Sequence, residues 1–307
     1  VRQLTVPNPF CEGLYRLYVI AEDPVTLIDT AVATQQSFDT FEAGLKEEGL
    51  RVQDIRRVVL THKHIDHLGN AWRIQQASGA EIWIHESECE AVVHVDPTGQ
   101  EFVDLLGERL KEWQTPARIR TDTFSHVMPH WEIEPAEVQP LVDGQRLTFA
   151  TGELEVIHTP GHTIGSICLR FGNALFTGDH VLPSISPNVG GGDLGHRGLL
   201  AMFMASLQRI KQEGDGLLAF PGHGPPFSTL VARCDELYEH HVERLDQIRS
   251  VLRERPLTVF QLAERLFGEM DDFHVVLGCA EAHSHLEWLL EQGQVILGND
   301  GVRFQLT

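Results

Sequence analysis

Three histidines and an aspartate stand within six residues of one another, at His62, His64, Asp66 and His67. Neutral imidazole nitrogens and carboxylate oxygens form the ligand set of Zn²⁺ and similar divalent ions, whereas Mg²⁺ and Ca²⁺ prefer oxygen ligands. An apolar run over residues 55–60 predicts a buried strand just before them, and an extended chain would put His62 and His64 on the same side. A solvated histidine-rich loop is the plainer alternative. The residue types favour a metal site.

Three further polar residues, His162, Asp179 and His223, follow predicted strands in the second half of the chain. They lie in the stretches 159–163, 177–179 and 221–224, each of which contains glycine. Glycine lets the backbone bend tightly, and loops at strand ends commonly carry functional side chains. We therefore expect these three side chains to point into one crevice with the first cluster.

In order and spacing, these motifs resemble the metallo-β-lactamase superfamily over about residues 10–235. The family's His-X-His-X-Asp-His motif corresponds to residues 62–67, and its later ligands to the three residues of the second half. The resemblance implies one metal ion held by His62, His64 and His162, a second held by Asp66, His67 and His223, and Asp179 as the bridge between them.

Two positions narrow the resemblance to particular branches. An Asp at position 179 resembles the glyoxalase II and ribonuclease branches. The zinc β-lactamases that use a cysteine ligand at this place would need Cys here, so antibiotic hydrolysis is disfavoured. His64 stands where the flavo-di-iron branch has Glu, which argues against redox chemistry. The stretches 178–182 and 186–188 and the C-terminal tail resemble β-lactamase-like hydrolases that carry a C-terminal winged helix.

The elements that position these residues alternate between strands and amphipathic helices in two halves, which is typical of an α/β protein. Strands are expected at 14–20, 25–28 (a hairpin with the first), 55–61, 81–85, around 141, 147–149, 154–157, 167–171, 174–176 and 217–220, and helices at 37–48, 70–79, 199–211 and 231–248. With the resemblance, this predicts a four-layer αββα sandwich over residues 1–235. Residues from about 86 to 138 read as a mainly helical insertion.

Residues 236–307 are expected to form a linker helix and a small winged-helix-like module. Thr258 and Gln261 have the spacing of a capping box for a first helix, a second helix runs from about 273 to 292, and a hairpin follows. From Pro256 onward there are eight acidic side chains against two basic ones, and the second helix has no Lys or Arg. A helix without positive charge does not suit phosphate backbones, so packing, dimerisation or pocket completion is the favoured role.

Composition also disfavours nucleic acid as a partner and indicates the setting of the protein. The formal net charge of −20 disfavours nucleic acid and anionic membranes as partners. The five cysteines are scattered and no apolar run is long enough for a membrane helix, so a cytoplasmic protein without disulfides is expected. The chain begins at Val1 without a basic-then-apolar leader, and without an initiator Met it is expected to be trimmed.

The function expected from this reading is a binuclear metal-dependent hydrolase. Two divalent ions, with Zn²⁺ as the first candidate and Mn²⁺ or Fe as alternatives, would supply a bridging hydroxide as the nucleophile, oriented by Asp66 and Asp179. The expected substrate is a small ester or thioester, as in glyoxalase II or an acyl-thioesterase, and the protein could form a homodimer. A metal-dependent phosphodiesterase or ribonuclease is the first alternative, and a non-catalytic winged-helix regulatory protein with a metal site is the second.

Several other residues are weaker candidates. His196 and Arg197 follow the glycines at 190, 192 and 195 and are candidate contacts for an anionic substrate group, although exposed pairs of this kind are usually solvated. The glycines fit a nucleotide-binding pattern only formally, because no clear strand precedes them. His180 is a candidate support for the ligands. Residues 126–131, with two histidines and a tryptophan, are a candidate lid.

Overall fold

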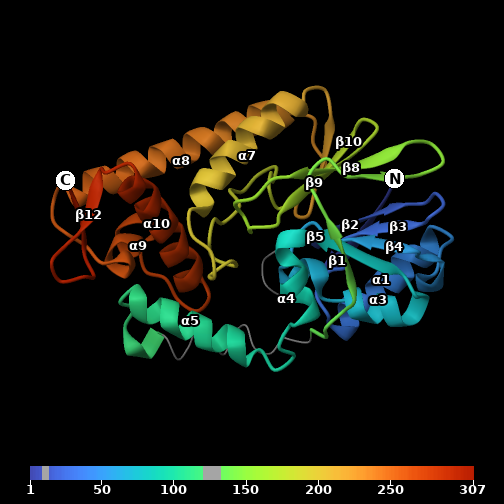
Figure 1. The fold of residues 1–307 in the computed structure, drawn as a ribbon, viewed down its shortest axis with the longest axis horizontal. Helices are drawn as coiled ribbons and strands as arrows, with labels where there is room; N and C mark the ends of the chain where they lie inside the picture. The colour runs from blue at the N-terminus through green and yellow to red at the C-terminus, as the bar shows by residue number, and fades with distance from the viewer. Residues whose placement is uncertain (9–13, 120–132) are drawn as a thin grey trace.

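The computed structural model describes residues 1–8, 14–119 and 133–307, and two β-sheets form its centre (Figure 1). Within the described residues, the first sheet has six strands in the order β1-β2-β3-β4-β5-β6. Their bounds are β1 Arg2–Pro7, β2 Leu14–Ile20, β3 Thr26–Ile28, β4 Arg57–Val59, β5 Glu81–His85 and β6 Val138–Leu141. β1 to β3 pair antiparallel, which confirms the predicted hairpin, and β3 to β6 pair parallel.

The second sheet has five strands in the described chain, in the order β11-β10-β9-β8-β7. Their bounds are β7 Arg146–Thr148, β8 Glu153–His158, β9 Ile167–Phe171, β10 Ala174–Gly178 and β11 Leu218–Pro221. Neighbouring strands pair antiparallel except β10 and β11, which are parallel. Apolar side chains of both sheets meet in one buried cluster that includes Tyr18, Ile28, Val59, Val156, Leu169 and Phe176. The two sheets therefore pack face to face.

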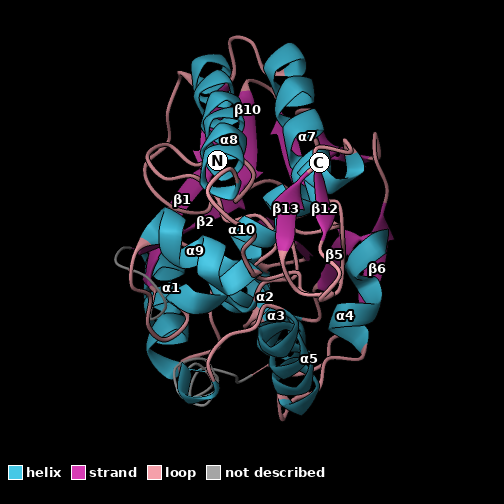
Figure 2. Ribbon diagram, turned by 90° about the vertical axis from the view of Figure 1, so that its left-hand side faces the viewer, coloured by secondary structure: helices cyan, strands magenta, loops and turns pink. Residues whose placement is uncertain are grey.

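Helices cover the outer faces of both sheets, with the helical layers and sheets seen from two sides in Figures 1 and 2. α1 (Gln35–Glu47) and α3 (Ala71–Ser78) bury apolar side chains against the first sheet, and α7 (Leu199–Glu213) and α8 (Leu230–Leu252) do so against the second. The layers run α, β, β, α, so the predicted sandwich is confirmed. Strand β1 and the short elements η1 (Val52–Asp54) and α2 (Ile65–Leu68) were not anticipated from the sequence.

Between β5 and β6, the described residues form helices and no strand. They include η2 (Glu86–Glu88), α4 (Cys89–Val93) and α5 (Gln100–Glu112), and residues 117–119 are helical as well. Leu106 and Leu110 of α5 belong to the same apolar cluster as α7 and α8, so α5 packs onto the second half of the molecule. The helical character expected of this region is present in its described part.

The C-terminal region has the predicted order of helix, helix and hairpin: α9 (Val259–Phe267), α10 (His274–Glu291), β12 (Val295–Leu297) and β13 (Phe304–Leu306). The Thr258–Gln261 capping box is formed. Apolar side chains of the C-terminal region, such as Leu262 and Leu286, belong to the same buried cluster as those of α7 and α8. The core is thus continuous across residue 236, while the domain boundary there and the winged-helix likeness stay predictions. No helix among the described residues is long and apolar enough to cross a membrane.

Candidate metal centre

The predicted ligands lie just beyond the ends of strands that belong to both sheets. His62 and His64 follow β4, His162 follows β8, Asp179 directly follows β10 and His223 follows β11. The sheets are joined at this edge, since the backbone N–H of Arg16 donates to the Gly222 carbonyl at 2.9 Å and that of Ile167 to the Thr61 carbonyl at 2.9 Å. Residues far apart in the sequence therefore meet at one point between the sheets.

A first trio of nitrogens converges from three histidines. His64 Nδ1 lies 2.9 Å from His62 Nε2 and 3.0 Å from His162 Nε2. The tautomer of His162 follows from its other nitrogen, because Nδ1 lies 2.8 Å from the Asn188 carbonyl, which only accepts. His162 therefore directs an unprotonated Nε2 at the other two rings, as a metal ligand must.

A second trio consists of Asp66, His67 and His223. Asp66 Oδ2 lies 3.9 Å from His67 Nε2 and 3.6 Å from His223 Nε2. These residues, like the first trio, place possible ligand atoms within 4.8 Å of one another. The carboxylate of Asp29 lies 2.9 Å from His67 Nδ1, which makes Nδ1 the donor and leaves Nε2 as the nitrogen that a metal ion would bind.

Asp179 lies between the two trios. Its Oδ1 is 3.5 Å from His67 Nε2, and its Oδ2 is 3.3 Å from His223 Nε2 and 3.7 Å from His162 Nε2. These distances are too long for strong hydrogen bonds. One carboxylate thus faces nitrogens of both groups, which is the position that a bridging ligand would need.

The donor atoms fit a pair of divalent cations. Among the described residues, His67 Nε2 and Asp179 Oδ1 are buried without a hydrogen-bond partner. Buried polar atoms normally have one, and a cation between these two atoms would satisfy both. The assignment of these seven residues as ligands stays a prediction.

Electrostatics keep His62, His64 and Asp179 in the states that bind metal. Burial lowers the pKa of His64 to about 3, helped by the nearby His162, and burial also lowers that of His62 well below its ordinary value. Burial alone would raise the pKa of Asp179, but His223 and His67 outweigh it and hold this pKa well below the ordinary range. His62 and His64 are therefore neutral and Asp179 is ionised at neutral pH. His67 differs, because burial would lower its pKa but Asp179, Asp29 and Asp66 outweigh it and raise this pKa well above the ordinary value, so a metal ion must displace a proton from this ring.

Two glycines allow the strands to approach this closely. Gly178 has a φ of +49°, and a Cβ there would lie 2.8 Å from the Thr61 side chain. A Cβ on Gly222 would lie 2.6 Å from Asp179 Oδ1 and 2.8 Å from His67. The glycines beside Asp179 and His223 are needed because side chains would displace the cluster.

A family model decides the relationship. The model described as the metallo-beta-lactamase superfamily matches residues 16–223, which contain every residue of the cluster. The chain belongs to the metallo-β-lactamase superfamily.

Similarity to known proteins extends over nearly the whole length of this superfamily member. The probable metallo-hydrolase YqjP of Bacillus subtilis is 25% identical over 311 residues, which cover 93% of this chain and 91% of that protein. A metallo-beta-lactamase family protein from Thermus thermophilus has a TM-score of 0.86 and 29% identity, covering 100% of this chain and 98% of that one. A beta-lactamase domain protein from Burkholderia ambifaria, at 24% identity and a TM-score of 0.84, shares the fold over 100% of this chain and 92% of its own. This superfamily member is a metal-dependent hydrolase.

Three contributors to the site were not anticipated from the sequence. Tyr15 donates its hydroxyl hydrogen to Asp66 Oδ2, and its ring lies against His223. Asp29 supports His67, and it follows a strand parallel to β4, which is the signal that could have identified it. It also has a φ of +59°, unusual for a residue other than glycine and often found at functional sites. Asn188 had no such signal, because it acts through its backbone carbonyl.

The weaker candidates have other surroundings. His196 Nδ1 lies 2.7 Å from Asp193 Oδ1, and Arg197 forms ion pairs of 2.8 Å with Glu112 and Glu287. Their contact with substrate stays a prediction. His180 is buried and packs against Phe203. The candidate lid residues His126, His130 and Trp131 lie outside the described residues.

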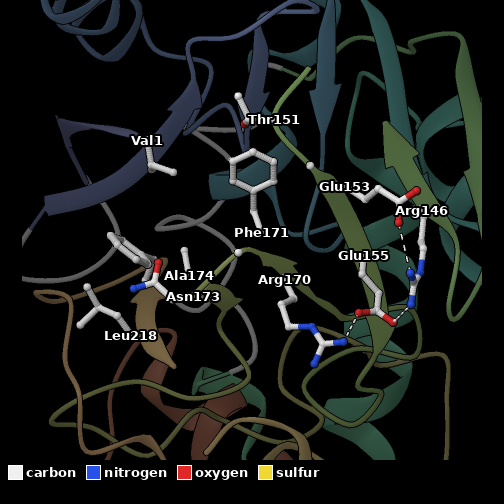
Figure 3. A pocket seen from close by; sticks show the side chains of 13 residues that line it. Val1, Arg146, Thr151, Glu153, Glu155, Arg170, Phe171, Asn173, Ala174 and Leu218 are labelled. Atoms are coloured by element: carbon white, nitrogen blue, oxygen red, sulfur yellow. Dashed lines mark hydrogen bonds and ion pairs between the residues drawn. The ribbon is translucent and has the colours of Figure 1, made fainter. Parts of the chain in front are cut away.

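A separate cavity of about 730 Å³ lies at the edge of the second sheet (Figure 3). Its charged lining residues pair with one another, since Arg146 contacts Glu153 and Glu155, and Arg170 contacts Glu155. None of the residues of the two trios lines it. It therefore belongs to a different face of the molecule from the candidate metal centre.

Proposed function

We propose that this superfamily member binds two divalent metal ions, with Zn²⁺ as the first candidate, and hydrolyses a small ester or thioester. The observation that carries the proposal is the position of Asp179, whose two oxygens face nitrogens of both trios. When bound, such ions acidify water and polarise the bond to be cleaved. The protein's own part is to hold the ligands in the correct tautomers and charge states.

Hydrogen bonds from outside the two trios perform that task. Asp29 keeps the proton of His67 on Nδ1, and Asn188 does the same for His162. Tyr15 donates to Asp66 and limits the rotation of its carboxylate. Because these partners are in place, the ligand atoms need little rearrangement when metal binds.

Charge supports a small substrate over a polyanion. The net charge of −20 repels RNA, and two cations on the surrounding loops already have carboxylate partners. Lys63 Nζ lies 2.7 Å from Asp193, and Arg197 is held by Glu112 and Glu287. The Lys63 ammonium and the Arg197 guanidinium are therefore both engaged by carboxylates and are not available to bind a phosphate group.

The test measures metal per chain and then hydrolysis of a thioester, a lactone, bis-p-nitrophenyl phosphate and a short RNA. We expect close to two metal ions and ester or thioester turnover that Asp179→Ala and His64→Ala abolish. Asp39→Ala, at an exposed position on α1, is the matched control and should behave as wild type. Turnover that survives both site substitutions would refute the mechanism, and preference for RNA would favour the nuclease alternative.

A further inference from the structure

Residues 186–193 lie between helix α10 and the first histidine trio. On the helix side, the Val189 N–H donates to Glu281 Oε2 at 3.2 Å, and the Ser284 hydroxyl donates to the Val189 carbonyl at 3.1 Å. Asn188 adds a third link, since its Nδ2 donates to the Leu277 carbonyl at 3.0 Å. Three successive turns of α10 thus hold two consecutive residues of the loop.

On the other side, the same loop contacts the histidines. The Asn188 carbonyl accepts from His162 Nδ1 at 2.8 Å. Gly192 packs on the ring of His64, because a Cβ there would lie 2.0 Å from Nε2. Asn188 Oδ1 also accepts from the Gly191 N–H at 2.8 Å. The Asn188 side chain therefore also holds the part of the loop that leads to Gly192.

The glycines of the loop follow from this narrow space. A Cβ on Gly190 would lie 2.6 Å from Ser284 Oγ, and one on Gly191 would lie 2.2 Å from Asn188 Oδ1. Positions 190 and 191, like position 192, therefore have no room for a side chain. Close packing accounts for Gly190, Gly191 and Gly192 without a nucleotide site.

We propose that Asn188 is a positioning residue for metal binding, and that α10 acts through it to fix His162 and His64. The proposal rests on the proposed metal function and assigns a role to the C-terminal region. The Asn188 side chain keeps the carbonyl of the same residue facing His162 Nδ1, so that Nε2 keeps its lone pair. Glu281 and Ser284 hold the neighbouring residue and thereby the loop.

The surroundings of α10 make this testable without unfolding the protein. Asn188, Leu277 and Glu281 line a cavity of about 590 Å³ together with residues of α8 and of the segment before α10. Shortening a side chain that borders an existing cavity disturbs the core less than creating a new void. Loss of the tether should therefore affect the loop more than the fold.

The experiment compares Asn188→Ala, Glu281→Ala, Glu281→Gln and Ser284→Ala with wild type. Zn²⁺ affinity is measured by competition with a chromophoric chelator, Co²⁺ binding by its absorption spectrum, and apo-protein stability by thermal unfolding. His274→Ala is the control, because His274 is an exposed residue of the same helix.

We expect Asn188→Ala to weaken binding of one metal about 10–100-fold, the range for second-layer partners of a ligand, and to change the Co²⁺ spectrum. Glu281→Ala and Ser284→Ala should weaken it in the same direction. Glu281→Gln should keep affinity near wild type, since its amide oxygen can still accept from Val189. Apo-protein unfolding should stay close to that of His274→Ala.

Variants that all bind both metals like wild type would overturn the inference and leave the proposed function intact. If Asn188→Ala and Glu281→Ala lower apo stability in step with affinity, and Glu281→Gln does the same, the role is general folding and the inference fails. A wild-type chain that binds no metal would instead refute the proposed function.

Discussion

Asp29→Asn probes how the second trio is built. Asp29 Oδ2 accepts from His67 Nδ1 and from Thr61 Oγ1, each at 2.9 Å, and Oδ1 accepts from the Thr61 N–H at 2.7 Å. Asparagine has the same shape and tolerates the positive φ of 59°. One of its two terminal atoms, however, donates instead of accepting. In either orientation, an amide hydrogen faces a group that donated to the carboxylate.

The magnitude follows from the two orientations. With the amide nitrogen toward His67, the ring accepts through Nδ1 and carries its proton on Nε2, where it blocks metal binding. With the nitrogen toward the Thr61 N–H, a buried donor is left unsatisfied, at about 1–3 kcal/mol. We expect a loss of affinity for one metal of about 10–100-fold, or about 1.4–2.8 kcal/mol, and a modest loss of apo stability.

The assay is a Zn²⁺ titration against a chelator, with urea unfolding of the metal-free protein alongside. Asp39→Asn, on the exposed face of α1, is the control for the change in charge. Two ions bound at wild-type affinity in Asp29→Asn would show that Asp29 does not set the protonation of His67.

Three other predictions concern single groups. Tyr15→Phe removes the hydroxyl that donates to Asp66, so turnover should fall about tenfold, the equivalent of one hydrogen bond to a charged group, and unchanged kcat would exclude that role. Gly192→Ala should lose metal from the first trio because a Cβ would lie 2.0 Å from His64 Nε2, whereas Gly195→Ala, with nothing within 4 Å, should bind normally in the same titration. Burial raises the pKa of Glu281 to about 7. The folded state therefore keeps a proton that the unfolded state releases near pH 4.5, so stability should fall by about 3 kcal/mol from there to about pH 7. Glu281→Gln should flatten this part of the urea-unfolding profile, and an equal fall in the variant would assign it to other groups.

Periodicity and spacing predicted most of the fold. The strand at Glu81–His85 and the helices over residues 37–48 and 199–211 have strong local patterns, and the structure has elements there with small shifts at their ends. β1 was missed because residues 2–7 carry only a weak alternation. The four-residue helix α2 lies inside the metal motif, where the histidines obscure any apolar period.

The site could be predicted only as far as its ligand types. His62, His64 and the other members of the trios can be identified from the sequence by their side-chain chemistry and their position after strands. The residues that set their tautomers do not, because a backbone carbonyl such as that of Asn188 looks the same in any sequence. The Asn188 side chain bonds to Leu277, and the backbone of Val189 bonds to Glu281 and Ser284. These hydrogen bonds join segments about ninety residues apart, which only the folded chain brings together.

The continuous core across residue 236 has a consequence for folding. One buried cluster contains Leu106 of α5, Phe203 of α7 and Leu286 of α10, so these helices share a single hydrophobic core. Units that share a core melt together. The C-terminal helices should therefore unfold in the same cooperative transition as the second sheet. A chain cut at residue 235, inside α8, would lose most of that helix along with its tail and would leave the apolar face of α7 exposed to solvent.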